Sequence, residues 1–190
     1  MGASALGFIF YEKSPRYIDI KTAKMMTRNN SNSKFIGVFV NEDSEYIKKV
    51  IDEVELHGIQ LHGNESNSFC QLFDVPVIKA IPLKPNLNKS IFNSYNVSAL
   101  LLDTYDINLV GGTGKTFDWS SVNLDQIKLP VILAGGLNNK NILKGIETVN
   151  PSALDISSGV EIRPRKKSKT KMKNIFSKLI YTKNKGYNFE

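Results

Sequence analysis

Short apolar runs alternate along the chain with amphipathic stretches, and the apolar runs predict β-strands. Ala99–Leu102 and Val131–Ala134 are apolar at every position. Such continuous runs are typical of parallel strands covered on both faces, whereas a strand with one solvated face alternates between apolar and polar residues. The same pattern predicts seven strands: Ala5–Tyr11, Phe35–Val40, Gly58–His62, Val75–Ile81, Ala99–Tyr105, Val131–Leu137 and Ala153–Val160.

The stretches between these strands have the spacing of amphipathic helices. Asp43–Val54 is the clearest case, because its apolar residues recur every three or four positions and Asp43 or Asn41 can cap its N-terminus. Strands start every 17 to 32 residues, which is the rhythm of repeated βα units. We therefore predict a single α/β domain over residues 1–190, with a basic C-terminal helix and tail from about residue 163. Further helices are predicted at Ile20–Arg28, Ser66–Phe73, Asn86–Tyr95, Asn138–Val149 and Lys169–Tyr181.

The residues that follow the predicted strands decide between the α/β architectures. A doubly wound sheet usually has a glycine-rich turn after its first strand, but Ala5–Tyr11 leads into Glu12–Arg16. In a (β/α)8 TIM barrel the carboxyl ends of the strands meet at one mouth, which holds the active site. We therefore predict a (β/α)8 TIM barrel with seven of its eight strands, incomplete by one βα unit at the N-terminus. Polar residues or glycines stand at the strand ends: Arg16, Asn41, His62, Lys79, Asp103, Gly135-Gly136 and Ser157–Gly159.

Length and composition exclude several classes of protein. With 41% apolar and 23% charged residues, the 190-residue chain can form a core, and whole-chain disorder is excluded. No apolar stretch approaches the ~20 residues that cross a bilayer, and the N-terminus lacks the pattern of a secretory signal, so we expect a cytoplasmic protein. The single cysteine, Cys70, excludes an intramolecular disulfide, and two histidines argue against a zinc site. We therefore predict no metal.

The net charge of +7 is located at the C-terminal end of the chain. The last thirty residues hold ten Lys or Arg and two acidic residues, whereas the first 160 are nearly neutral. The basic residues from Arg163 to Lys173 are interleaved with serine and threonine, not with the aromatics expected of a nucleic-acid-binding segment. We favour a solvated terminal segment, and nucleic-acid binding through residues 163–185 remains an alternative.

Gly111–Thr116 is the most conspicuous local motif, with the sequence Gly-Gly-Thr-Gly-Lys-Thr. A phosphate-binding P-loop would need its first glycine at Leu109, and a helix where Phe117-Asp118-Trp119 follows. Nucleotide binding is therefore not predicted. A glycine-rich loop after a barrel strand suits a mobile cover over the mouth, and a simple long loop is the alternative.

Three side chains at predicted strand ends could act on a substrate. Asp103 follows four apolar residues, where a carboxylate is costly unless it faces a polar mouth or has a partner. We predict a general acid there, with a structural, loop-capping aspartate as the alternative. For Asp155, a substrate contact and a supporting role are both open. His62 is either a substrate contact or a satisfied hydrogen-bonding residue, and His57 is predicted to be a cation at a helix C-terminus.

Glycines after the last two predicted strands indicate an anion site. Gly135-Gly136 and Ser158-Gly159 can present backbone N–H groups near a helix N-terminus, which is the usual way to bind a phosphate. Arg16 could hold a carboxylate or a phosphate through two hydrogen bonds, unless it is simply an exposed loop arginine. We expect a phosphorylated small molecule as the substrate.

Taken together, these segments resemble phosphoribosylanthranilate isomerases. Ala5–Ile18 is similar to the second βα unit of that family, and further motifs follow in the family's order and spacing. The resemblance covers residue 3 to about residue 162. The further motifs are Gly37–Asn41, Gln60–Gly63, Leu101–Asp103, Gly111–Trp119, Leu133–Leu137 and Asp155–Glu161.

The resemblance implies a (β/α)8 barrel of tryptophan biosynthesis that needs no cofactor. Its reaction would convert N-(5-phosphoribosyl)anthranilate to 1-(2-carboxyphenylamino)-1-deoxyribulose 5-phosphate. The resemblance implies Asp103 as the general acid, Arg16 as the partner of the anthranilate carboxylate, and His62 and Asp155 as further active-site residues. The phosphate is implied to lie against the backbone of two segments, Gly135-Gly136 and Ser158-Gly159.

Two features depart from the family pattern. The family's general base is a cysteine that ends the first strand in an Ile-Cys-Gly-Leu-like motif, which these 190 residues do not contain, and Cys70 falls on a predicted outer helix. We therefore expect the chain as given to be inactive. Arg163–Lys173 also replaces a less basic segment that usually contains glycine. The alternatives are an inactive partial barrel that keeps the phosphate site, another phosphate-binding barrel of amino-acid biosynthesis, and a basic nucleic-acid-binding protein.

Overall fold

Parallel strands alternate with helices in the computed structural model, which describes residues 2–29, 33–84, 87–103, 127–180 and 182. The chain divides into two compact units. Of the described residues, 2–29, 33–80 and 94–99 belong to the N-terminal unit, and 81–84, 87–93, 100–103, 127–180 and 182 belong to the C-terminal unit. The single domain expected over residues 1–190 stays a prediction.

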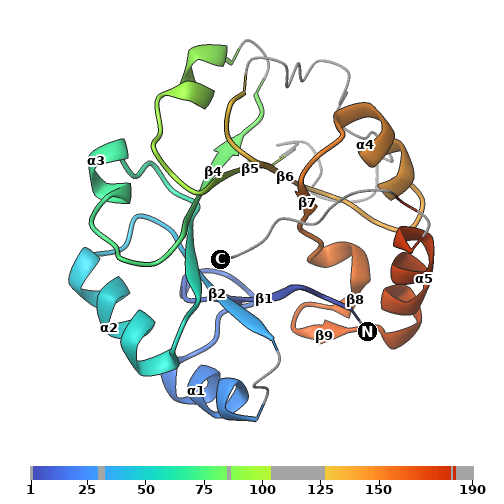
Figure 1. The fold of residues 1–190 in the computed structure, drawn as a ribbon. Coiled ribbons are helices and arrows are strands. Elements are labelled where there is room, and N and C mark those ends of the chain that lie inside the picture. The colour runs from blue at the N-terminus through green and yellow to red at the C-terminus, as the bar shows by residue number, and fades with distance from the viewer. Residues whose placement is uncertain (1, 30–32, 85–86, 104–126, 181, 183–190) are drawn as a thin grey trace. The chain divides into compact units, whose positions relative to one another are not determined.

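Parallel strands of the N-terminal unit pair in chain order. These strands are β1 (Ala5–Ile9), β2 (Lys34–Phe39), β3 (Gly58–Leu61) and β4 (Val77–Pro82), of which residues 77–80 belong to this unit. Three helices, α1 (Ile20–Arg28), α2 (Ser44–Val54) and the short α3 (Asn67–Cys70), lie on one side of them (Figure 1). Each helix begins after a capping side chain, Asp19, Asp43 or Ser66, which accepts a hydrogen bond from a backbone N–H of the first turn.

Aromatic and aliphatic side chains of the strands and of α2 form the core of the N-terminal unit. Phe10 and Phe39 stack with ring centroids 5.3 Å apart, and Ile47 of α2 is fully buried. Gly37 allows the close approach of the chain after α2, because a Cβ at this position would lie 2.6 Å from the Leu56 side chain. The core therefore brings α2 directly against β2.

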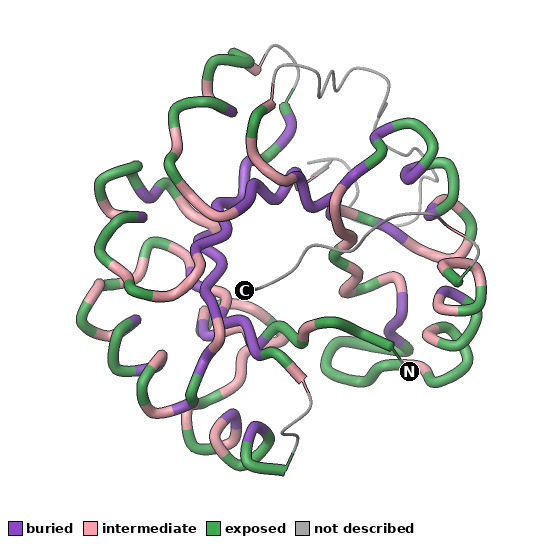
Figure 2. Tube along the Cα trace, viewed as in Figure 1, coloured by how far each residue is buried: buried purple, intermediate pink, exposed green. Residues whose placement is uncertain are grey.

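The strands of the N-terminal unit differ in burial. β2, β3 and β4 are buried at nearly every position, whereas β1 exposes Leu6 and Gly7 (Figure 2). Continuous burial confirms, for β2 to β4, the prediction of parallel strands covered on both faces.

The C-terminal unit repeats the same arrangement with β5 (Ala99–Asp103), β6 (Val131–Ala134) and β7 (Ala153–Leu154), which are parallel and pair in chain order. Helices α4 (Ile142–Val149) and α5 (Lys169–Leu179) lie on one side of β6 and β7 (Figure 1). A hairpin of β8 (Glu161–Arg163) and β9 (Lys166–Lys167) joins the 3₁₀ turn η4 (Ser158–Val160) to α5. Buried Ile142, Ile146, Val160 and Ile175 form the core between these elements.

Some predicted elements differ from the observed ones, and one observed element was not predicted. The strand predicted over residues 153–160 ends at Leu154, because residues 158–160 fold into η4. The helix predicted over residues 86–95 is only the 3₁₀ turn η1 (Lys89–Asn93) in the described residues. Asn88 accepts a hydrogen bond from the Ser90 N–H at 3.1 Å, and such side-chain bonds compete with helix formation. The β8–β9 hairpin was not predicted at all.

Candidate active site

Asp103 ends β5 at the edge of the C-terminal unit where its other strands also end. Residues 99–102 are at most 1% exposed, whereas Asp103 is half-buried. The register places Asp103 beside Ala134, which precedes Gly135, and the Asp155 N–H donates to the Leu133 carbonyl at 2.9 Å. Asp103, Gly135 and Asp155 therefore lie along one edge, as predicted from their positions after strands.

The two glycine segments predicted to bind phosphate lie against each other. Gly135 and Gly136 have φ angles of 79° and 63°, in the left-handed region that favours glycine. A Cβ on Gly136 would meet no atom within 4 Å, so the space beside this backbone is open. A Cβ on Gly159 would overlap the Leu137 carbonyl oxygen, so this close approach requires glycine. The structure thus brings the segment after β6 into contact with η4.

Two asparagines hold the turn that carries Gly136. The side-chain amides of Asn138 and Asn141 donate to the Gly136 carbonyl at 2.8 and 3.1 Å. Asn141 is also the residue before α4, and its Oδ1 accepts from the Asn138 N–H at 2.8 Å. The glycine turn is therefore attached to the N-terminal end of α4.

The basic C-terminal segment supports the same region. Lys167 Nζ donates to the Ser157 carbonyl and to the Glu161 carboxylate, each at 3.0 Å. Lys171 Nζ donates to the Glu161 carbonyl at 2.6 Å. Both lysines bind groups within the C-terminal unit, which weakens the nucleic-acid alternative for this part of the segment.

Arg16 lies in the turn after β1 in the N-terminal unit. The Arg16 N–H donates to Ser14 Oγ at 3.2 Å, and the Tyr17 N–H donates to the Ser14 carbonyl at 3.0 Å. The Ile18 N–H returns to the Ile9 carbonyl at 2.9 Å, which closes the turn. The backbone that carries the half-buried Arg16 is therefore well defined.

His62 follows β3 in the same unit. Its N–H donates to the Phe39 carbonyl at 2.8 Å, and Gln60 Nε2 lies 2.9 Å from His62 Nδ1. Because an amide nitrogen only donates, Nδ1 accepts this bond, which leaves Nε2 as the ring nitrogen that carries a proton. His62 can therefore donate a hydrogen bond from Nε2.

His57 corrects a prediction, because it is not a cation at a helix C-terminus. α2 ends at Val54, and Glu55 forms its left-handed cap with a φ of 58°. His57 Nδ1 accepts a hydrogen bond from the Phe35 N–H at 3.3 Å. Burial and the nearby Lys34 lower the pKa of His57, so its ring is neutral at neutral pH.

A buried ion pair next to the loop that carries His62 was not predicted from the sequence. Lys79 Nζ lies 2.9 Å from Glu65 Oε2, and the two side chains are 2% and 3% exposed. Burial opposes the ionisation of Glu65, but hydrogen bonds from Lys79 and from the Asn41 N–H outweigh it and lower the pKa of Glu65. The signal in the sequence is a lysine within the apolar run around Val77–Pro82.

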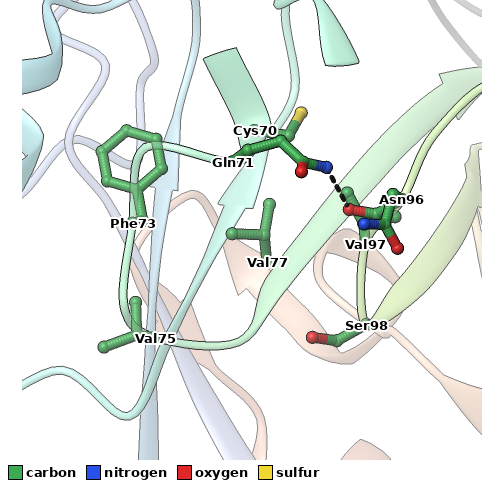
Figure 3. A pocket seen from close by; sticks show the side chains of 8 residues that line it. All are labelled: Cys70, Gln71, Phe73, Val75, Val77, Asn96, Val97 and Ser98. Carbon is green, nitrogen blue, oxygen red and sulfur yellow. Dashed lines mark hydrogen bonds between the residues drawn. The ribbon is translucent and has the colours of Figure 1, made fainter. Parts of the chain in front are cut away.

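Cys70 lies at the end of α3, as the prediction of a helix at this position required. Its side chain is buried, and burial raises the pKa of the thiol. Cys70 lines a hollow of about 410 Å³ together with Phe73, Val77 and Asn96, whose carbonyl accepts from the Gln71 side chain (Figure 3). None of the predicted site residues lines this hollow.

The glycine-rich motif, a metal site and a membrane-spanning helix remain to be considered. The Gly111–Thr116 motif lies outside these residues. Among the residues that are described, no three His, Cys, Asp or Glu side chains are grouped so that they could hold a metal ion. In that same part of the chain, no helix has the length and apolar character needed to cross a membrane.

Comparison with known proteins identifies the family. The family model of N-(5'-phosphoribosyl)anthranilate (PRA) isomerase matches residues 1–178. The chain belongs to the PRA isomerase family. The N-(5'-phosphoribosyl)anthranilate isomerase of Hahella chejuensis is 42% identical over 163 residues, which are 84% of this chain and 76% of that protein.

Solved structures of PRA isomerases agree with this assignment. The crystal structure of the enzyme from Thermotoga maritima has a TM-score of 0.82 at 37% identity, over 93% of this chain and 87% of that one. A phosphoribosylanthranilate isomerase in complex with reduced 1-(o-carboxyphenylamino)-1-deoxyribulose 5-phosphate has a TM-score of 0.78 at 34% identity, over 97% and 88% of the two chains.

Membership of the PRA isomerase family confirms the fold class and the enzyme class. The chain has the α/β, TIM-barrel-like fold of the solved relatives, and its described residues contain seven parallel strands of it. The family's activity is the isomerase reaction of tryptophan biosynthesis that the motifs indicated. The roles of single residues stay predictions.

Proposed function

We propose that this chain isomerises N-(5-phosphoribosyl)anthranilate to 1-(2-carboxyphenylamino)-1-deoxyribulose 5-phosphate, with Asp103 as the general acid. The family match supports the reaction. One observation carries the role of Asp103: its carboxylate ends an apolar strand at the edge where Gly135 and Asp155 also lie. An acid and an anion-binding backbone segment on one edge are what this substrate, a phosphorylated sugar, requires.

In the proposed reaction Asp103 protonates the ring oxygen of the ribose, and the ring opens to a Schiff base. A base then removes the C2′ proton, and the resulting enolamine tautomerises to the ketone. The resemblance assigns the base to a cysteine of an Ile-Cys-Gly-Leu-like motif and not to Cys70. A positioned acid contributes roughly 10²–10⁴-fold to such a step, because it supplies the proton as charge develops on the leaving oxygen.

The remaining predicted residues would bind the substrate. Backbone N–H groups at Gly135-Gly136 and Ser158-Gly159 suit the phosphate, because the left-handed glycines and the start of α4 favour an anion. Arg16 suits the anthranilate carboxylate, since its guanidinium can donate two parallel hydrogen bonds. His62 would donate from Nε2, and Asp155 would accept from a substrate hydroxyl.

We also propose that the protein works in the cytoplasm on a small molecule, without nucleic acid or membrane. A phosphorylated substrate supports this location, because a charged group crosses a bilayer only at high cost.

Calorimetric titration with the reduced reaction product, reduced 1-(o-carboxyphenylamino)-1-deoxyribulose 5-phosphate, tests the phosphate site. This ligand binds without any chemical step. Gly136→Val should lower the affinity by about a hundredfold, since a branched side chain blocks the open space beside the backbone and disfavours a φ of 63°. Deletion of residues 183–190 is the control and should leave the affinity nearly unchanged. A tail deletion more damaging than a folded Gly136→Val variant would contradict the assignment.

A further inference from the structure

Lys79 is a buried lysine in the middle of an apolar strand. It lies on β4, and its side chain is 2% exposed. A charged ammonium group loses its hydration at such a place, so it is tolerated only where protein atoms replace the water. The partners of Lys79 therefore show what this lysine is needed for.

The ammonium group of Lys79 binds three oxygens around His62. Nζ donates to the Leu61 carbonyl at 3.2 Å, to the Gly63 carbonyl at 2.7 Å and to Glu65 Oε2 at 2.9 Å. Three acceptors match the three N–H donors of an ammonium group. Lys79 thus binds the backbone carbonyls of the two residues on either side of His62, Leu61 and Gly63.

Glu65 extends this network to the turn after β2. Its carboxylate accepts from the Asn41 N–H at 2.8 Å and from the Gly63 N–H at 2.9 Å. Asn41 Oδ1 in turn accepts from the Asn64 N–H at 2.6 Å. A Cβ on Gly63 would overlap Asn41, so the loop after β3 is packed directly on this turn.

The backbone of His62 is therefore held from both sides, while its ring is held by Gln60. The His62 N–H binds the Phe39 carbonyl, and both neighbouring carbonyls bind Lys79. Gln60 Nε2 then binds Nδ1, which leaves Nε2 as the protonated nitrogen. An apolar pair could stabilise the fold as well as an ion pair does, but only a buried donor can bind these two carbonyls.

We propose that Lys79 and Glu65 are positioning residues, which hold the loop of residues 61–65 so that His62 presents its Nε2–H to the substrate. The proposal rests on the proposed function, in which His62 contacts the substrate. Neither residue touches the reacting atoms in this account. Their effect passes through the His62 peptide and its ring.

Nitrogen-15 NMR of the two histidine rings tests the proposal directly. The chain contains only His57 and His62, so His57 serves as an internal reference. The His62 ring of the unaltered chain should show a single tautomer, with the proton on Nε2. A His62 ring with its proton on Nδ1 would overturn the proposal without any variant.

The double variant Lys79→Met/Glu65→Leu removes both charges together and leaves no unpaired ion. We expect the His62 signals to change to a mixture of tautomers while the His57 signals stay in place. Affinity for the reduced product should fall about tenfold or more, as expected for a misplaced binding group. Lys48→Met, which breaks an exposed ion pair on α2, should change neither the ring signals nor the affinity.

The combined outcomes separate this proposal from the proposed function. A folded double variant with unchanged His62 signals would overturn the positioning role. Changed His62 signals with unchanged affinity would show that His62 does not contact the ligand, which contradicts its role in the proposed function. If the double variant does not fold, the conservative variant Glu65→Gln, which weakens the hold on the loop without changing the size of the side chain, decides the question by the same ring signals and affinity.

Discussion

Each unit of the molecule contains a buried glutamate whose lysine partner also binds a backbone carbonyl beside a proposed substrate-binding residue. In the N-terminal unit, Lys79 and Glu65 are 2% and 3% exposed, and Lys79 binds the carbonyls on both sides of His62. In the C-terminal unit, Glu161 is 4% exposed but Lys167 is 41% exposed, and Lys167 binds the Ser157 carbonyl. The two pairs share their chemistry and differ in how far water reaches the lysine.

This difference determines what each pair contributes. An ammonium group that keeps part of its hydration gains little from an ion pair and is screened by salt. A buried pair has no such alternative, so loss of one partner leaves an uncompensated charge. Loss of one partner of the Lys79–Glu65 pair should therefore destabilise the fold strongly. Loss of Lys167 from the Lys167–Glu161 pair should destabilise it only weakly.

Removal of one lysine at a time should produce the largest contrast. Lys79→Met leaves the Glu65 carboxylate buried without its cation, and should lower the free energy of unfolding by about 3–5 kcal/mol. Lys167→Met should lower it by only about 1 kcal/mol, because water reaches this site. Urea unfolding of both variants measures the two values. Equal losses would show that exposure of the lysine does not matter here.

The stabilisation by the buried Lys79–Glu65 pair should depend on pH, which gives the next largest effect. The pKa of Glu65 lies below its ordinary value of 4.5, so the unfolded chain takes up this proton first. The stabilisation is complete above pH 4.5 and is lost as the pH falls through the lower pKa of the folded state. The difference in unfolding free energy between the unaltered chain and Lys79→Met/Glu65→Leu, measured in urea at pH 6 and pH 3, should therefore shift in acid in favour of the variant. A difference that does not change with pH would contradict the lowered pKa of Glu65.

The β8–β9 hairpin, which carries Glu161 and Lys167, contains a position where a substitution should stabilise the fold. Register pairs Arg163 with Lys166, so Pro164 and Arg165 form the turn, and Arg165 has a φ of 67°. A side chain in this left-handed region is strained, so Arg165→Gly should raise the free energy of unfolding by about 1 kcal/mol. Arg165→Ala removes the same charge without relieving the strain and is the control. Equal thermal stabilities of the two variants would assign the effect to charge.

Salt should have the smallest effect, and it should weaken only the Lys167–Glu161 pair. The coupling energy between Lys167 and Glu161, measured by a double-mutant cycle, should be about 1 kcal/mol or less and should decline in 1 M NaCl. The coupling between Lys79 and Glu65 should keep its size, because ions do not reach it. Two couplings that decline together would mean that both lysines are equally accessible in solution.

The elements were predictable wherever local pattern alone decides the structure. α1 occupies Ile20–Arg28 as predicted, because its apolar spacing and the Asp19 cap are both local. The apolar runs located β5 and β6, and the residue after each run, an aspartate or a glycine, indicated the edge where Asp103 and Gly135 lie. Parallel pairing then brings such residues together without further information.

The ion pairs could not be predicted, because they depend on contacts between distant residues. Lys79 on β4 and Glu65 in the loop after β3 are fourteen positions apart, and only the β3–β4 register brings them together. The same holds for the hairpin that carries Lys167, since Pro164-Arg165 lacks the glycine that usually marks a turn of this kind. A lysine within an apolar strand was the visible signal, and its partner was not.

The role of Asp103 is tested most directly by Asp103→Asn in any catalytically competent form of the protein. Turnover is followed by the loss of substrate fluorescence, and binding by titration with the reduced product. The account predicts that turnover falls by at least about a thousandfold, while affinity changes by no more than a few-fold and the fold is kept. Asparagine has nearly the shape of aspartate but cannot donate the acid proton. An Asp103→Asn protein that keeps most of its turnover would show that the acid is another residue.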